Sequence, residues 1–231
     1  MAIRWEAEAC DLDPDPQSGA PISRLTAAVM SNINIYCEQP YASPDGRRIA
    51  YTRSSGPDPR VPPFELRVAD LGTLRTACIE PVVVSNWVGT SSWSGLIYYL
   101  RENGELIRVD LQTLEKEIVI THWELPRHFG LQSVSPDHRY LFGVLRRPEF
   151  ACSIVRVDLQ THEWTPIFDH DEVLGHLQVD FAGGRDLLVQ LNRGTRIDHL
   201  GRRKQVPGAE TTATHFLIDL EGGNLRRLPV G

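Results

Sequence analysis

Polar side chains that could bind a ligand stand at the start of several apolar, strand-like runs of this sequence. They are Gln39, Asn86, Gln132, His176 and Gln178. A polar side chain in an apolar strand costs free energy to bury unless it binds a ligand or bonds another polar group. We therefore expect these residues to converge near one axis, with a ligand role for His176. A structural polar network is the alternative interpretation.

The other histidines are weaker candidates. His128 stands at the entry to an apolar run and is a second choice for a ligand contact. The rest fall in turns or polar loops and are expected to face solvent: His122, His138, His162, His170 and His199.

Arginines gather in two loops, 146-RRPEFAC-152 and 192-NRGTRIDHLGRRKQVPGAETTAT-214. The candidates for ligand contact are Arg146, Arg147, Asn192 and Arg193, with Arg196, Arg202 and Arg203 further along. A guanidinium pairs with a planar carboxylate through two parallel hydrogen bonds, and long loops in compact domains often carry function. These loops therefore favour a small acidic ligand, with ordinary surface arginines as the alternative.

The elements that position these residues repeat along the chain. The phrase 43-SPDGRRIAYT-52 returns as 135-SPDHRYLFGV-144, with degenerate copies at 91-SSWSGLIYYL-100 and 180-DFAGGRDLLVQL-191. In a second repeated phrase, a strand-like run ends in an aspartate, usually Asp-Leu, and a polar turn follows. Its aspartates are Asp70, Asp110, Asp158 and Asp219, separated by 40, 48 and 61 residues. Four antiparallel strands in roughly 40–50 residues are typical of a β-propeller blade.

The predicted fold class is therefore all-β, a single β-propeller domain over residues 1–231 with four to five blades of four antiparallel strands. We expect blades at about 33–80, 81–120, 121–170 and 171–231. Residues 1–32 form an N-terminal segment that is a candidate part of a closing blade. The Ser, Pro, Asp and Gly of the repeated phrases, and the four aspartates above, are predicted to form turns.

Composition excludes several classes of function. The net charge is −6 and arginine is scattered, so nucleic-acid binding by a basic face is not expected. No apolar run reaches roughly eighteen residues, and the acidic N-terminus is not a signal peptide, so no membrane association is expected. Four cysteines without CxxC spacing favour free thiols in the cytoplasm. The motifs GxSxG, HExxH, GxGxxG and the P-loop do not occur.

Specific pieces of the sequence resemble one enzyme family. They are Asn-x-Tyr-x-x-Gln-Pro within 33-INIYCEQPYASPDGRRIAYT-52, Gly-His-Leu-Gln within 175-GHLQVD-180, the loop 192-NRG-194 and the end 223-GNLRRLPVG-231. Together they resemble the oligogalacturonate lyases of polysaccharide lyase family 22, over nearly the whole chain. The resemblance implies a TolB-like, seven-bladed propeller, of which about three blades would lie beyond Gly231.

The resemblance also implies a chemistry. The family cleaves short unsaturated galacturonides from pectin by β-elimination and uses Mn²⁺, whose ligands would lie beyond Gly231. Its general base maps onto His176, and histidine has a suitable pKa for that role. Gln39, Gln132, Gln178, Arg146, Arg147, Asn192 and Arg193 are then substrate-binding candidates. Where the family has a catalytic arginine, this chain has Ser153, and Arg147 or Arg193 are candidate substitutes.

Two other functions remain open at this point. A non-enzymatic TolB-like propeller would bind an acidic sugar or a protein on its arginine-rich face. The propeller cap of a serine peptidase is the third reading, and it is disfavoured because no nucleophile-bearing α/β segment follows.

Overall fold

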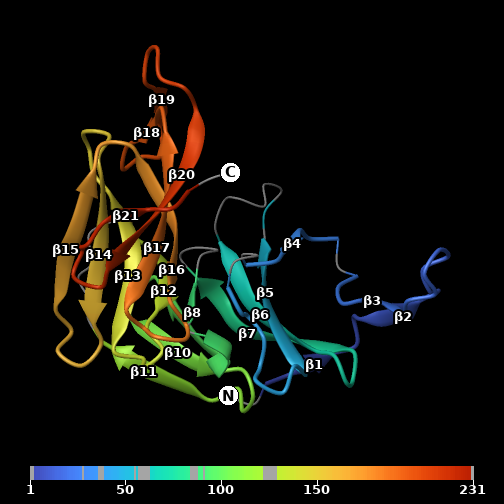
Figure 1. Ribbon diagram of the computed structural model, residues 1–231. Helices are drawn as coiled ribbons and strands as arrows, with labels where there is room; N and C mark the ends of the chain where they lie inside the picture. Colours follow the sequence, from blue (N-terminus) through green and yellow to red (C-terminus); the bar gives the residue numbers. More distant parts are fainter. Residues whose placement is uncertain are drawn as a thin grey trace.

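The computed structural model describes residues 3–27, 29–35, 39–54, 56, 63–83, 88–90, 92–121 and 129–229. Nearly all regular structure is β-strand, and the described residues contain one short 3₁₀ helix, η1 (Ser92–Ser94). Figure 1 shows the strands gathered into successive sheets that follow the order of the chain. In the described part of the chain, no helix has the length and apolar character to cross a membrane.

Four four-stranded units succeed one another along the chain, and each is a blade of a β-propeller. The first contains β4 (Asn32–Ile33), β5 (Arg48–Ser54), β6 (Phe64–Asp70) and β7 (Arg75–Val83). The second contains β8 (Gly89–Thr90), β9 (Leu96–Leu100), β10 (Leu106–Asp110) and β11 (Lys116–Ile120). The third contains β12 (Phe129–Val134), β13 (Tyr140–Arg146), β14 (Cys152–Asp158) and β15 (Trp164–His170). The fourth contains β16 (Val173–Val179), β17 (Asp186–Arg193), β20 (Thr212–Asp219) and β21 (Arg226–Arg227).

Neighbouring strands within each blade are antiparallel, as the repeats predicted. The second and third blades join through their first strands, which pair in parallel at Thr90 and Ser133. Two small hairpins stand apart from the blades. They are β2 (Cys10–Leu12) with β3 (Ile22–Arg24), and β18 (Thr195–Ile197) with β19 (Arg203–Gln205). In Figure 1 the β18–β19 hairpin extends beyond the end of the fourth blade.

The N-terminal segment joins the first blade. Strand β1 (Trp5–Glu6) pairs with the outer strand β7, so the sheet has five strands in the order β1-β7-β6-β5-β4. Two buried arginines of the blade hold this segment. Arg67 donates to Glu6 at 2.6 Å, and Arg53 donates to Glu8 at 2.5 Å. Residues that were a candidate part of a closing blade thus extend the outer edge of the first blade.

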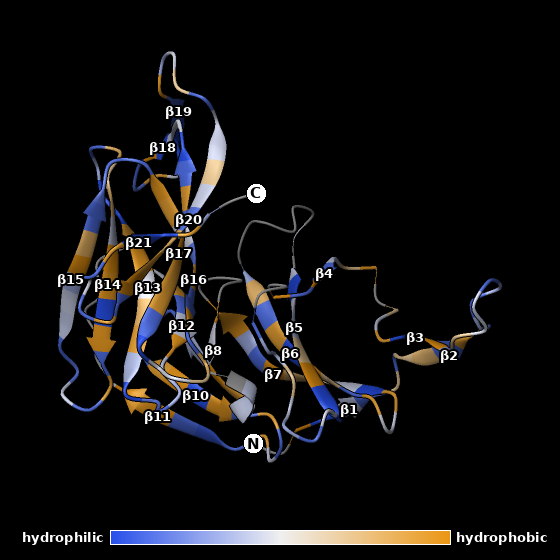
Figure 2. Cartoon of the chain, in the orientation of Figure 1, coloured by the Kyte–Doolittle hydropathy of each residue, from blue (hydrophilic) through white to orange (hydrophobic). Residues whose placement is uncertain are grey.

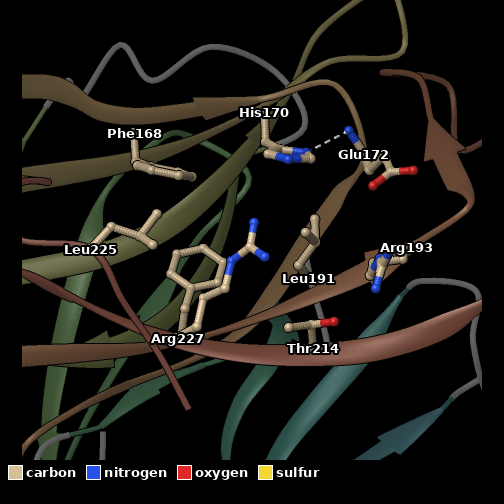
Figure 3. A pocket seen from close by; sticks show the side chains of 9 residues that line it. Phe168, His170, Glu172, Leu191, Arg193, Thr214, Leu225 and Arg227 are labelled. Atoms are coloured by element: carbon tan, nitrogen blue, oxygen red, sulfur yellow. Dashed lines mark hydrogen bonds between the residues drawn. The ribbon is translucent and has the colours of Figure 1, made fainter. Parts of the chain in front are cut away.

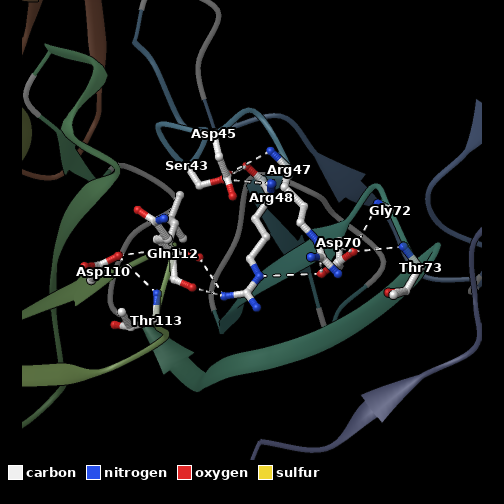
Figure 4. Close-up of polar contacts among 11 residues, drawn as sticks. Ser43, Asp45, Arg47, Arg48, Asp70, Gly72, Thr73, Asp110, Gln112 and Thr113 are labelled. Atoms are coloured by element: carbon white, nitrogen blue, oxygen red, sulfur yellow. Dashed lines mark hydrogen bonds and ion pairs between the residues drawn. The ribbon is translucent and has the colours of Figure 1, made fainter.

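The repeated phrases form the turns that the sequence predicted. In the first copy, the Ser43 hydroxyl donates to Asp45 and accepts the backbone N–H of Arg48 at 2.8 Å, while Gly46 takes a φ of 67° (Figure 4). The second copy repeats these contacts with His138 at the positive-φ position. Each of the four repeated aspartates accepts backbone N–H groups two and three or four residues ahead: Asp70, Asp110, Asp158 and Asp219. These residues are therefore turn-formers.

The hydrophobic core lies between consecutive blades. Because side chains alternate across a strand, Leu141 of β13 packs toward the second blade and its neighbour Phe142 packs toward the fourth. Three such clusters fill the spaces between blades one and two, two and three, and three and four. Figure 2 shows the hydrophobic residues concentrated in the middle strands of the sheets. Each blade therefore depends on its neighbours for burial.

The loops that carry the arginines share one end of the blades, called here the loop end. Strand β13 ends at Arg146 and β17 ends at Arg193. The first strands of the same blades begin there, since Phe129 pairs with Leu145 and Val173 pairs with Asn192. Candidate ligand residues on the first strands and in these loops thus approach the same end of the molecule.

Candidate functional site

His176 lies on a β-bulge in the first strand of the fourth blade. Gly175 pairs with Gln190 and Gln178 pairs with Leu188, so two residues, His176 and Leu177, stand opposite one residue of β17. His176 has a φ of 54°, in the left-handed region that residues other than glycine seldom adopt. Such bulges re-aim side chains and recur next to active sites. The imidazole is half-buried.

Two glutamines from other blades hold this bulge through the backbone of Leu177. Gln132 accepts the Leu177 N–H at 2.6 Å, and the Gln39 side-chain amide donates to the Leu177 carbonyl oxygen at 3.1 Å. Gln132 is itself the additional residue of a bulge in β12, between Leu131 and Ser133. Gln39 and Gln132 therefore meet at the residue next to His176, and their hydrogen bonds there are those of a structural polar network.

The polar network leaves some groups for a ligand. The Gln39 Oε1 atom is buried and has no hydrogen-bond partner among the described residues. A buried carbonyl oxygen in this state costs free energy, which a donor from a ligand or water would recover. Gln178, two residues beyond His176, is half-buried on the same strand. Asn86 and His128, the two remaining candidates near the axis, lie outside the described residues.

The arginines at the end of β13 differ in their availability. Arg147 donates to Asp169 at 3.1 Å, and the buried Ser153 hydroxyl donates to the same carboxylate at 2.6 Å. Arg147 is thus held by an ion pair to the outer strand β15, on the carboxylate that also accepts from Ser153. Arg146 is exposed and has no ion-pair partner in the described part of the chain.

Asn192 and Arg193 lie on opposite faces of β17, although the sequence placed them together in one site. Asn192 accepts from Gln190 at 2.8 Å, and Gln190 in turn bonds His215 at 3.1 Å. This polar row faces away from the third blade, because Leu187 and Val189 of the same strand pack toward it. Arg193 shares the face of Leu187 and Val189, so only one of the two residues faces the third blade.

The long loop after β17 is anchored by its own ion pairs. Arg196 pairs with Asp171, and Arg202 pairs with the fully buried Asp198 at 2.6 Å. The backbone N–H of His199 donates to the Arg147 carbonyl oxygen at 3.2 Å, which ties the loop to the third blade. Two of the loop arginines are therefore structural.

A cavity of about 260 Å³ lies between the third and fourth blades at the loop end (Figure 3). Nine side chains from four strands and two loops line it: Phe168, His170, Glu172, Leu191, Arg193, Thr214, Phe216, Leu225 and Arg227. The sequence identified only Arg193 of this set. His170, expected to face solvent, is half-buried, lines the cavity and accepts the N–H of Glu172 on its Nδ1 at 2.9 Å. The lining residues are far apart in the chain, so no sequence motif or spacing could have identified them together.

The described residues do not form the manganese site that the family resemblance implies. No group of three or more His, Cys, Asp and Glu side chains among them could hold a metal ion. At the His176 bulge, glutamine side chains bond the backbone of Leu177. The prediction that ligands lie beyond Gly231 concerns residues outside this chain.

The comparisons with known proteins identify the fold class. No protein-family model matches the chain, and no curated protein matches it. Among solved structures, it is similar to an oligogalacturonate lyase in complex with manganese, with a TM-score of 0.64 and 20% identity over 98% of this chain and 60% of that one. An oligogalacturonate lyase from Vibrio parahaemolyticus matches with a TM-score of 0.63 and 16% identity over 98% and 59% of the chains. TolB from Acinetobacter baumannii matches with a TM-score of 0.56 and 14% identity over 93% and 47%.

These matches define the fold as a β-propeller, as the repeats predicted. Two of these similar structures are oligogalacturonate lyases, and this chain spans about 60% of their length. At these identities the likeness shows the fold, and the chemistry has to be argued from the site.

Proposed function

We propose that this chain carries the base-bearing part of a lyase that cleaves short acidic oligosaccharides, unsaturated galacturonides in the first place, by β-elimination. The observation that carries the proposal is the His176 bulge. A half-buried histidine sits in left-handed backbone, and its neighbour Leu177 is bonded by Gln39 at the carbonyl and by Gln132 at the N–H. Backbone strain supported by other blades is a common property of active sites.

The elimination needs a base and a partner for the carboxylate. The base removes the proton from the ring carbon next to the uronate carboxylate. The electron pair of that C–H bond forms the new carbon–carbon double bond, and the glycosidic oxygen leaves from the adjacent carbon with the bonding pair. Negative charge grows on the carboxylate as the proton leaves, so a positive group that faces it lowers the barrier.

This chain supplies both kinds of group at the loop end. His176 is the proposed base. Arg146 has no ion-pair partner among the described residues and is the proposed carboxylate contact, with Gln178 as a further substrate contact. Arg193 instead lines the cavity between the third and fourth blades, which does not include His176. Gln39 and Gln132 position the bulge and touch substrate only through their remaining amide atoms. Arg147 and Asn192, which already bond Asp169 and Gln190, are the weaker candidates.

Hydrogen bonds to the neighbouring backbone fix the position of the proposed base, His176. A general base must lie within hydrogen-bond reach of the proton that it removes, and displacement of about 1 Å can cost a hundredfold in rate. The bonds to Leu177 come from the first and third blades, so two parts of the chain far from His176 fix its backbone. We further propose that manganese, held by residues outside the described set, is required, and that the protein acts in the cytoplasm.

The test is turnover of digalacturonate, followed through the ultraviolet absorbance of the unsaturated product in the presence of Mn²⁺. His176→Ala should lower the rate at least about a hundredfold, the usual contribution of a general base. His162→Ala is the matched control, because His162 also has a positive φ, of 64°, but lies exposed in a turn. Turnover that survives in His176→Ala as it does in His162→Ala would remove His176 from the mechanism.

The alternative is a non-enzymatic propeller that binds an acidic sugar. Two observations favour it: TolB is among the similar structures, and Gln39 and Gln132 already bond the backbone. In that case digalacturonate should bind without being cleaved, and a chelator should leave the affinity unchanged. Activity lost in chelator and restored by Mn²⁺ supports the lyase instead.

A further inference from the structure

The cavity between the third and fourth blades has an apolar interior. Phe168 of β15 and Phe216 of β20 face each other with ring centroids 5.4 Å apart and planes tilted by 45°. Leu191 and Leu225 complete this part of the lining. An apolar surface of this kind favours a ligand with an apolar body, and it leaves the hydroxyl groups of a sugar ring without hydrogen-bond partners.

The cavity is part of the packed structure between the blades. The turn after β20 closes directly on β15, because a Cβ placed on Gly222 would lie 1.9 Å from the carbonyl oxygen of Ile167. Gly222 also has a φ of 87°, so this position requires glycine for two reasons. Arg156 donates to the Leu220 carbonyl oxygen at 3.2 Å across the same contact. The two blades are thus fastened here, and the cavity above the contact is preformed.

Two arginines give the cavity its charge. Arg193 and Arg227 line it, and neither guanidinium has a hydrogen-bond or ion-pair partner among the described residues. Figure 3 shows the Arg227 guanidinium directed into the space between Leu225 and Leu191. An arginine without a partner beside an apolar surface is a ready contact for a carboxylate, which it can bind through two parallel hydrogen bonds.

The remaining polar groups of the cavity are the His170 imidazole, which can donate a hydrogen bond, and the Glu172 carboxylate, which already accepts one. His170 Nδ1 accepts the Glu172 N–H, which leaves Nε2 as the ring nitrogen that can donate to a ligand. The Glu172 carboxylate accepts the Gly194 N–H at 2.8 Å. Two arginines against one carboxylate, which already accepts a hydrogen bond, give the cavity a net positive charge.

We propose that this cavity binds a small carboxylate whose apolar body is about the size of one aromatic ring. The ring would lie against Phe168, Phe216 and Leu191, and the carboxylate would pair with Arg227 and Arg193. The volume of about 260 Å³ is at the small end of ligand sites, which restricts the occupant to a molecule of this size. This site is separate from the elimination chemistry, because no step of it uses His176.

The test is a titration of the full 231-residue chain with hydrocinnamate, followed by NMR of the backbone amides. Saturable shifts are expected at residues 191–193 and 214–216. Hydrocinnamamide, which has the same body without the charge, should bind at least about tenfold more weakly. Arg227→Gln should weaken hydrocinnamate binding by roughly tenfold as well.

Arg226→Gln is the matched control. Arg226 is the adjacent residue of β21, is also exposed, and pairs with Asp186 instead of lining the cavity. Its substitution should change the affinity by less than about twofold. The proposal is overturned if the backbone amides of residues 191–193 and 214–216 show no saturable shift. It is also overturned if hydrocinnamamide binds as tightly as hydrocinnamate, or if the Arg227→Gln and Arg226→Gln variants bind hydrocinnamate alike. Because His176 plays no part, these results are independent of digalacturonate turnover.

Discussion

Two contacts between blades treat charged side chains in opposite ways. Between the first and second blades, the nearly buried Glu80 accepts from the Tyr99 hydroxyl at 2.7 Å and from Arg101 at 2.8 Å, and Lys116 lies at 3.3 Å. Between the third and fourth blades, Arg193 and Arg227 border a cavity with no partner among the described residues.

The difference follows from exposure. Glu80 is 8% exposed, and a charge so far from water must be paired and hydrogen-bonded to be tolerated. Arg193 and Arg227 are exposed, so water solvates them and no partner is needed. Charges in the first contact therefore hold the blades together, whereas those in the second are available for a ligand.

The pKa of Glu80 reflects this environment. Burial by itself raises the pKa of the Glu80 carboxyl, but the hydrogen bonds from Arg101 and Tyr99 and the charge of Lys116 outweigh it. The net effect is a pKa below the ordinary value of 4.5. The carboxylate is therefore more stable in the folded protein than in the unfolded chain.

The largest expected effect comes from removing the charge at Glu80. Glu80→Gln keeps the shape of the side chain but leaves Arg101 and Lys116 without their shared carboxylate. We expect the free energy of unfolding to fall by about 2 kcal/mol, measured by urea denaturation. Glu117→Gln, which breaks the exposed pair with Arg108, is the control and should cost less than about 1 kcal/mol. Equal losses in both variants would show that the Glu80 contacts are no stronger than a surface pair.

A smaller effect is expected on the pH dependence of stability. Because the folded-state pKa of Glu80 is depressed, its contribution is present above the unfolded value near 4.5 and is lost as the pH falls through the folded value. The difference in unfolding free energy between the wild type and Glu80→Gln should thus be constant near neutral pH and shrink below about pH 4.5. A difference that stays unchanged to lower pH contradicts this assignment.

The smallest expected effect is at the unpaired arginine. Arg227→Gln removes an exposed charge with no partner, so the free energy of unfolding should change by less than about 0.5 kcal/mol in either direction. The same urea denaturation measures it. A loss as large as that of Glu80→Gln would mean that Arg227 holds the blades together, and the contrast between the two contacts would fail.

The turns and strands could be read from the sequence because their causes are local. An aspartate that accepts N–H groups a few residues ahead, as Asp70 and Asp158 do, needs no other part of the chain. The prediction that His138 faces solvent was wrong, because its Nδ1 lies 3.0 Å from the Tyr98 hydroxyl in the preceding blade. Burial there also lowers the pKa of His138.

The sequence by itself determined the β-propeller fold, the blade repeat, the turn residues and the residues that could meet at the first strands. Only the tertiary structure decided which of these residues are already engaged in hydrogen bonds or ion pairs within the protein. It bonded Gln39 and Gln132 to Leu177, fastened Arg147 to Asp169, and separated Asn192 from Arg193 across one strand. It also brought Phe168, Arg193 and Arg227 around one cavity. The physical reason is that these contacts join different blades, and their partners depend on how the blades pack, which no local pattern encodes.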